Sequence, residues 1–263
     1  MAVVYLRLWY RLGAMTQAAG EKGGSLAGMV ALVTGAAKRL GRAVAVRLAE
    51  EGADVVVHYW SSQSEAQDTV KEIEKLRRRS VAIGADLGSV GEIKRLFDEA
   101  GKHFGRLDIL VNSAANFLPA SMISTTEQIW DAALDTNLRA PFFCAQAAAA
   151  LLRRTQGIII NLADTGGLLG WTGYIPHSVS KAGVIMLTKV LAKALAPEVR
   201  VNAIAPGTIT MEGDPPEWET DFIKMAPLRR TGKPEDVTDT VLFLVQSKFI
   251  TGQVLVVDGG RML

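Results

Sequence analysis

The segment from residue 34 to residue 41 combines glycines with cations in a pattern suited to holding an anion. It reads Thr34-Gly-Ala-Ala-Lys-Arg-Leu-Gly41, and it lies between an apolar run and a stretch with apolar residues at helical spacing. Glycine lets the backbone turn tightly and approach a ligand, and a helix N-terminus offers free N–H groups and the positive end of its dipole. The segment therefore predicts a phosphate-binding loop, with ligand contacts from Gly35, Lys38, Arg39, Leu40 and Gly41.

The residues after the second predicted strand indicate which nucleotide the loop holds. A site for NAD usually places a carboxylate at the end of this strand, where it binds the ribose 2′-hydroxyl. Here the strand ends in Val57-His-Tyr-Trp-Ser-Ser62, which contains no acid. Lys38 and Arg39 would attract a 2′-phosphate, with serine hydroxyls as further donors. We therefore expect NADP(H) as the cofactor, with contacts from His58, Tyr59, Ser61 and Ser62. The alternative is that Lys38 and Arg39 are ordinary solvated charges.

The elements that would position this loop follow from the alternation of two periodicities. Short apolar runs predict strands at 29–34, 54–59, 80–85, 107–112, 157–162, 199–205 and 253–257. Amphipathic stretches predict helices at 40–51, 63–79, 90–104, 126–135, 138–153, 176–196 and 234–245. A polar, proline-containing insertion spans about 211–226. Strands apolar on both faces that alternate with helices require a covered parallel sheet. We expect a single-domain, doubly wound (Rossmann) α/β fold with a seven-stranded parallel sheet, which binds ligands at the carboxyl ends of its strands.

Composition narrows the classes of function. The 263 residues carry a net charge of +2, which gives no general attraction to nucleic acid. No apolar stretch is long enough to span a membrane. Cys144 is the only cysteine, which excludes an internal disulfide and favours a reducing, cytoplasmic compartment. The histidines lack metal-ligand spacing, so we expect no metal. We expect residues 1–27 to be a disordered extension, with a transit peptide as the alternative, and residues 28–263 to form the domain.

Several motifs together resemble the short-chain dehydrogenase/reductase family over about residues 28–263. The 34–41 loop is similar to the family's TGxxxGxG fingerprint, except that Arg39 replaces the middle glycine. Further matches are Asp86-Leu87, Asn112-Ser-Ala-Ala115, Asn137, Lys181-Ala-Gly183, Pro206-Gly207, and Gly252-Gln253 through Asp258-Gly-Gly260. The resemblance implies a small-molecule substrate and a homo-oligomer, either a tetramer or a dimer. It also implies cofactor contacts from Asp86, Leu87, Asn112, Ala114, Lys181, Pro206, Gly207, Thr208 and Ile209.

The catalytic positions that the resemblance implies are altered. The family uses Tyr-x-x-x-Lys on one helix face, and here Lys181 is preceded four residues earlier by His177. The family usually has serine thirteen residues before the tyrosine, where this chain has Asp164. A histidine donates a proton usefully only as imidazolium, a form that Asp164 would favour and Lys181 would oppose. The resemblance implies catalytic roles for Asn137, Asp164, His177 and Lys181.

One subgroup, the pteridine reductases, resembles the chain more specifically. It shares Asp164, Arg39, the His58-Tyr59 pair, and the loop in which Phe117 would stack on a flat pterin, with Tyr174 near the substrate. We therefore expect an NADPH-dependent reductase of a C=N bond in a dihydropterin or dihydrofolate. A general carbonyl or 3-oxoacyl reductase is the first alternative. A catalytically weak NADP(H)-binding sensor or partner subunit is the second.

Overall fold

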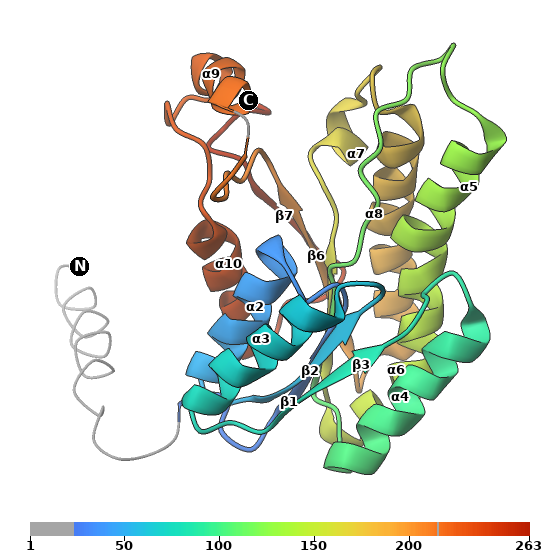
Figure 1. Ribbon diagram of the computed structural model, residues 1–263, viewed down its shortest axis with the longest axis vertical. Coiled ribbons are helices and arrows are strands. Elements are labelled where there is room, and N and C mark those ends of the chain that lie inside the picture. The colour runs from blue at the N-terminus through green and yellow to red at the C-terminus, as the bar shows by residue number, and fades with distance from the viewer. Residues whose placement is uncertain (1–23, 215) are drawn as a thin grey trace, which may run out of the picture.

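The computed structural model describes residues 24–214 and 216–263, which form one sheet with helices on both faces (Figure 1). The sheet contains seven parallel strands in the order β3-β2-β1-β4-β5-β6-β7. Their bounds are β1 Val30–Val33, β2 Asp54–Tyr59, β3 Ser80–Gly84, β4 Ile109–Asn112, β5 Ile158–Leu162, β6 Arg200–Pro206 and β7 Val254–Val257. The predicted fold class is confirmed. The direction of winding reverses between β1 and β4, the point where such sheets open a crevice for a ligand.

Two layers of helices cover the sheet. One layer contains α2 (Arg39–Glu50), α3 (Gln63–Lys75) and α10 (Pro234–Gln246). The other contains α4 (Val90–Phe104), α6 (Ala140–Thr155) and α8 (Ile175–Leu195). The smaller elements are α5 (Glu127–Leu134), the π-helical turn η1 (Asp135–Arg139), α7 (Gly166–Leu169) and α9 (Pro216–Met225). In Figure 1 α9 lies at one end of the molecule, beside the C-terminal residues.

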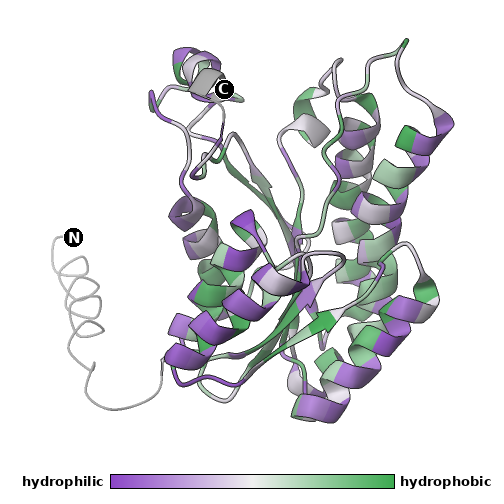
Figure 2. Cartoon of the chain, viewed as in Figure 1, coloured by the Kyte–Doolittle hydropathy of each residue, from purple (hydrophilic) through white to green (hydrophobic). Residues whose placement is uncertain are grey.

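Alternate residues of each strand belong to two separate hydrophobic cores, one on each face of the sheet. Ala31 and Val33 of β1 pack with α2, α3 and α10, whereas Val30 and Leu32 pack with α4, α6 and α8. Successive side chains of a strand point to opposite faces, so a strand covered on both faces must be apolar throughout. This explains the uninterrupted apolar runs in the sequence. Figure 2 shows the complementary pattern, with hydrophilic residues on the outer sides of the flanking helices.

Two predicted helices differ from the structure for local reasons. The helix predicted at 63–79 ends at Lys75, because Arg77 adopts a left-handed φ of 59° that an α-helix does not continue through. The helices predicted at 126–135 and 138–153 are not separated. The turn η1 joins α5 directly to α6 and inserts one wider turn around Asn137. Helix α9 forms inside the polar insertion predicted at 211–226, and the four-residue α7 was not predicted.

The first described residues of the N-terminal region pack against the domain. Of the extension predicted at 1–27, residues 1–23 lie outside the described residues. Leu26 is buried in the core, and the Ser25 hydroxyl donates to Glu51. Within the described part of the chain, no helix combines the length and apolar character needed to cross a membrane. The same residues contain no group of three or more His, Cys, Asp or Glu that could hold a metal ion.

Candidate functional site

Two cavities meet at the carboxyl ends of the strands. The first, which we call the loop groove, has a volume of about 620 Å³ and is lined by the 34–41 loop and the residues after β2, β3 and β4. The second, the His177 pocket, has a volume of about 630 Å³ and is lined by residues after β4, β5 and β6, by α8 and by α9. Arg39, Leu40, Ser113 and Ala115 line both cavities, so they form one continuous cleft.

The predicted site residues gather around this cleft. Those that line the loop groove are Gly35, Lys38, Arg39, Leu40, Gly41, His58, Tyr59, Ser61, Ser62, Asp86, Leu87 and Ala114. Those that line the His177 pocket are Phe117, Asp164, Tyr174, His177, Lys181, Pro206, Gly207, Thr208 and Ile209. Asn112 and Asn137 line neither cavity. They are buried behind its walls, where their side chains bind other parts of the chain.

The 34–41 loop packs so closely that two of its positions require glycine. Gly35 has a φ of 65°, and a Cβ there would lie 2.9 Å from Cα of Ala114. A Cβ on Gly41 would collide with the carbonyl oxygen of Gly35. The Thr34 hydroxyl accepts hydrogen bonds from the backbone N–H groups of Ser113, at 2.9 Å, and Ala114, at 3.0 Å. The loop is thereby fixed against the end of β4, with its backbone open to an anion in the groove.

Both ring nitrogens of His58 are bound to the backbone, one of them to the 34–41 loop, so neither is free to bind a ligand in the groove. Its Nδ1 accepts from the backbone N–H of Gly35 at 3.0 Å, and its Nε2 lies 3.0 Å from the carbonyl oxygen of Ala85. A carbonyl oxygen only accepts, so Nε2 carries the proton and the ring is neutral. Burial lowers the pKa of His58 to about 4, which keeps it neutral at ordinary pH.

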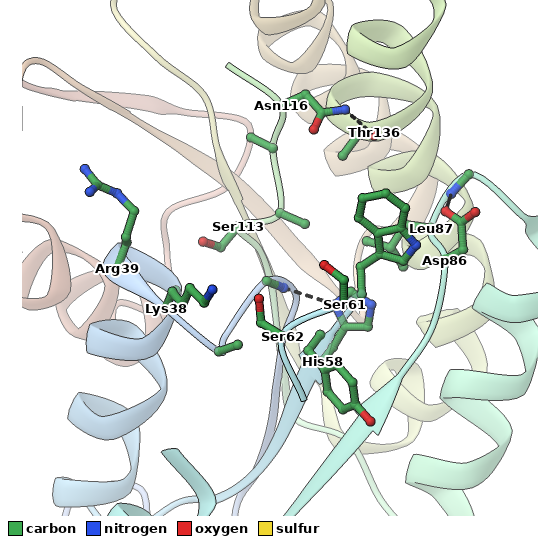
Figure 3. A pocket seen from close by; sticks show the side chains of 18 of the residues that line it. Lys38, Arg39, His58, Ser61, Ser62, Asp86, Leu87, Ser113, Asn116 and Thr136 are labelled. Carbon is green, nitrogen blue, oxygen red and sulfur yellow. Dashed lines mark hydrogen bonds between the residues drawn. The ribbon is translucent and has the colours of Figure 1, made fainter. Parts of the chain in front are cut away.

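Both cations of the loop are paired with carboxylates that sequence reasoning did not identify. Lys38 Nζ lies 2.6 Å from Glu65 at the start of α3, and both side chains are largely exposed. The Arg39 guanidinium binds both carboxylate oxygens of Asp214, at 2.7 and 3.0 Å. In Figure 3 the Arg39 side chain points away from Ser61 and Ser62, whereas Lys38 extends toward them. Asp214 is 175 positions from Arg39, and no local pattern in the sequence links them.

His177 presents a nitrogen without a partner to its pocket. Its Nδ1 lies 3.2 Å from the carbonyl oxygen of Asn116 and 3.5 Å from Nδ2 of Asn137. We assign a proton to Nδ1 because the shorter contact is with the carbonyl oxygen, which only accepts. Its Nε2 is buried and has no hydrogen-bond partner among the described residues, and the nearest carboxylate oxygen is Oδ2 of Asp164 at 3.7 Å. A buried polar atom without a partner is costly, so Nε2 is suited to bind a ligand or a second proton.

Asn137 holds the peptide group that orients His177. Its Oδ1 accepts from the Asn116 N–H at 2.7 Å, and its Nδ2 donates to the Asn116 carbonyl at 2.9 Å and to Ser180 at 3.0 Å. The wide turn η1 places Asn137 at this point. Asn137 therefore acts on the histidine through Asn116, and its Nδ2 also lies 3.5 Å from Nδ1 of His177. Asn112 lies further from the cavities, and its Nδ2 donates to Oδ1 of Asn161 at 2.8 Å.

Lys181 lies one helical turn after His177 and is almost fully buried. Its Nζ donates to the carbonyl oxygen of Leu162 at 2.7 Å. Burial lowers the pKa of Lys181 to about 8, and the charge of Asp164 opposes this shift. Oδ1 of Asp164 accepts from the Gly166 N–H at 2.6 Å, which leaves Oδ2 facing the histidine.

Aromatic rings form one wall of the His177 pocket. Phe117 stacks on Tyr174 with ring centroids 4.3 Å apart and planes 8° from parallel, and it meets His177 edge-on at 4.7 Å. Trp171 lies parallel to His177 at 6.2 Å. The sequence analysis gave no role to several other residues that line the two cavities. Trp60, Ser113 and Asn116 lie within or beside the quoted segments. The fold brings in the rest from outside the motifs: Thr136, Met211, Asp221, Met225 and Arg261.

Comparisons with known proteins agree with this architecture. A family model described as Enoyl-(Acyl carrier protein) reductase matches residues 35–261. A Staphylococcus aureus protein named 3-oxoacyl-(acyl-carrier-protein) reductase FabG is 40% identical over 240 residues, which cover 89% of this chain and 98% of the relative. A Metarhizium guizhouense protein named hydroxynaphthalene reductase-like protein Arp2 is 38% identical over 257 residues, covering 90% and 96%. The Staphylococcus name agrees with the 3-oxoacyl alternative of the sequence analysis rather than with its pterin interpretation.

A solved structure supports the same assignment. The short chain dehydrogenase from Burkholderia cenocepacia J2315 in complex with NADP has a TM-score of 0.86 and 34% sequence identity, over 90% of this chain and 99% of that one. Its bound NADP agrees with the cofactor expected from the residues after β2. The fold, the glycine loop and these matches over most of the chain lead to one conclusion: the chain belongs to the short-chain dehydrogenase/reductase family.

Proposed function

We propose that this chain is an NADPH-dependent reductase that converts the keto group of a 3-oxoacyl thioester to a hydroxyl group. The observation that carries the proposal is Nε2 of His177, which has no hydrogen-bond partner among the described residues. It lies in a pocket that is continuous with the loop groove and bordered by Lys181 and Asp164. This arrangement offers a proton next to a site that a nicotinamide ring can reach. The name of the Staphylococcus relative supports the 3-oxoacyl group as the substrate class.

The loop groove fits NADPH by the chemistry of its donors. The close packing at Gly35 and Gly41 brings the loop backbone to the edge of the groove, where the N–H groups at the start of α2 would bind a pyrophosphate. Lys38, Ser61 and Ser62 offer donors for a 2′-phosphate, and β2 ends without the carboxylate that would repel it. Asp86 and Leu87 would flank the adenine, and residues 206–209 would border the nicotinamide. When bound, the cofactor supplies a hydride to the keto carbon.

His177 supplies the proton that balances this hydride. Since its Nδ1 proton is held by Asn116, the second proton of the imidazolium sits on Nε2, the atom that faces the pocket. The carboxylate of Asp164 stabilises that cation from 3.7 Å. Nε2 of His177 would give its proton to the keto oxygen, where negative charge would develop during reduction. One hydride and one proton then account for the alcohol formed, and solvent reprotonates the histidine.

Lys181 and Asn137 position the reacting groups. The ammonium group of Lys181 is held by the Leu162 carbonyl at the edge of the pocket, where it would orient the nicotinamide ribose by hydrogen bonds. Asn137 keeps the Asn116 carbonyl aimed at the histidine. In this proposal His177 takes the place of the tyrosine that the family uses. We assign the activity to one domain over residues 28–263. The exposed Val179, Met186 and Val190 of α8 offer an apolar face for a dimer or tetramer.

Reduction of a pterin-like heterocycle is the second candidate, and the aromatic wall favours it. Phe117 is 45% exposed and stacks with Tyr174, so its ring presents a flat apolar surface at the pocket. A planar C=N substrate would stack against such a surface. The nitrogen of a C=N bond is also more basic than a keto oxygen, and it would depend less on His177.

A substrate panel separates these candidates. The purified chain is mixed with NADPH and with either a 3-oxoacyl thioester, a dihydropterin or a flat aromatic ketone, and the loss of NADPH absorbance is followed. Faster turnover of the thioester supports the proposal, and turnover of the dihydropterin alone supports the second candidate. Tight NADPH binding without turnover of any of the three compounds would contradict both and favour a binding protein.

A further inference from the structure

The ion pair between Arg39 and Asp214 ties the 34–41 loop to the segment that leads into α9. The guanidinium contacts both carboxylate oxygens, at 2.7 and 3.0 Å. Oδ2 of Asp214 also accepts from the Met211 N–H at 2.9 Å, and only 5% of the Asp214 side chain is exposed. The hydrogen bond to Arg39 lowers the pKa of Asp214, so the carboxylate is charged at neutral pH.

The two ends of this ion pair belong to different parts of the cleft. Arg39 lines both the loop groove and the His177 pocket. The turn from Met211 to Asp214 contributes Met211 to the wall of the His177 pocket, and helix α9 contributes Phe222 and Met225. The ion pair therefore joins the floor of the proposed cofactor site to a wall of the proposed substrate site.

The backbone of Arg39 adopts a conformation that is unfavourable for a residue with a side chain. Its φ of 50° is left-handed, a conformation that disfavours residues with a Cβ. The family fingerprint described above has glycine at this position, which adopts the conformation freely. The Arg39 side chain is therefore present at a conformational cost to the backbone. Among the described residues, the only ion pair that Arg39 makes is with Asp214.

Lys38 differs from Arg39 in how easily it can leave its partner. The Lys38–Glu65 pair is about half exposed on both sides, and water can replace either partner. Removing Arg39 would leave the buried carboxylate of Asp214 without its charged partner, which is costly. Lys38 can therefore turn to a 2′-phosphate, while Arg39 stays with Asp214.

We infer that Asp214 is a positioning residue for substrate binding, which acts through Arg39 to hold Met211, Phe222 and Met225 of the pocket wall in place relative to the loop that holds the cofactor. The inference rests on the proposed function for the identity of the substrate. It assigns the two cations separate tasks. Lys38 binds the 2′-phosphate of the cofactor, and Arg39 holds the wall of the substrate pocket in place through Asp214.

The test compares Asp214→Asn with Lys38→Ala in steady-state kinetics with NADPH and a 3-oxoacyl thioester. Asp214→Asn keeps the shape of the side chain and removes its charge. We expect it to raise the KM for the thioester about tenfold, with kcat and the Kd for NADPH nearly unchanged. Lys38→Ala should do the opposite, raising the Kd for NADPH and leaving the KM for the thioester. A higher Kd for NADPH in Asp214→Asn with an unchanged thioester KM would overturn the inference.

Further variants guard against a general loss of structure. Arg39→Gln removes the same ion pair from the other side, so it should match Asp214→Asn, and the double variant should add little. Asp214→Glu retains the charge and should recover part of the affinity for the thioester. The matched control is Glu72→Gln, which breaks the half-exposed ion pair between Arg42 of α2 and Glu72 of α3 and should change neither constant. An additive double variant, or an equal effect of Glu72→Gln, would contradict the inference.

Hydrogen exchange gives a readout that does not depend on turnover. In Asp214→Asn and Arg39→Gln, the amides around Met211 and Phe222 should exchange faster than in the unmodified protein, while those of β1 should not change. If no substrate is reduced but this difference is present, the proposed function fails and the ion-pair tie stands. If exchange around Met211 and Phe222 is unchanged in both variants, the tie itself is refuted, whatever the activity.

Discussion

Nε2 of His177 lies 3.7 Å from Oδ2 of Asp164, and neither atom donates or accepts a hydrogen bond within the described part of the chain. The separation is too long for a hydrogen bond, but it is short enough for the carboxylate to stabilise a positive charge on the ring. Lys181 lies on the same face of α8 as His177, and burial lowers the pKa of Lys181 to about 8. Three titratable groups thus border a pocket in which proton transfer is the natural chemistry.

Removing the charge of Asp164 should slow proton transfer without disturbing the pocket. In Asp164→Asn the side-chain oxygen can still accept from the Gly166 N–H, which is the only hydrogen bond that the Asp164 side chain makes among the described residues. The imidazolium loses its nearby anion, so we expect kcat for thioester reduction to fall about a hundredfold. Stopped-flow measurement of the hydride-transfer step checks this. An unchanged rate in Asp164→Asn would show that the carboxylate has no part in the chemistry.

The lowered pKa of Lys181 predicts a pH dependence of cofactor binding. The charged form of Lys181 attracts the anionic cofactor, and that form is lost as the pH rises above about 8. The Kd for NADPH should therefore be constant below this pH and should increase above it, by up to about tenfold per pH unit. Fluorescence titration measures the Kd. Lys181→Arg stays charged and should lose the dependence, and an identical pH profile in both proteins would contradict the assignment.

The neutral His58 predicts a loss of stability in mild acid. Burial lowers its pKa from 6.5 to about 4, so between these values the unfolded chain binds a proton that the folded chain does not. The contribution of His58 to stability is present above pH 6.5, declines as the pH falls toward about 4, and amounts to about 3 kcal/mol in total. His58→Asn can still accept the Gly35 N–H but does not titrate. Urea unfolding across this range should show a shallower pH slope for the variant, and parallel slopes would argue against the prediction.

Sequence periodicity predicted the sheet well because each strand is buried on both faces. The bounds of β2 and α4 match the predicted ranges, and the strand order follows from right-handed crossovers. The glycine loop after β1 and His177 on α8 both line the cleft, and a local motif singles out each of them. Each of these signals is local in the chain.

The contacts that define the site at atomic scale could not be read from the sequence. The Arg39–Asp214 pair joins residues 175 positions apart, and the orientation of His177 depends on a backbone carbonyl at Asn116. Helix α9 forms in a polar segment without a clear apolar period, and η1 arises from a local change in helix pitch around Asn137. These features depend on packing between elements, which no single-segment pattern records.

Proton donation by His177 is tested by comparing the kcat for reduction of a 3-oxoacyl thioester by NADPH in the unmodified protein and in His177→Phe. Phenylalanine keeps a flat ring against Phe117 but has no proton to donate. We predict a fall in kcat of about a hundredfold to ten-thousandfold in His177→Phe, with the Kd for NADPH unchanged, and recovery in His177→Tyr, which restores an O–H donor. A His177→Phe variant that reduces the thioester as fast as the unmodified protein would contradict the central claim that His177 delivers the proton.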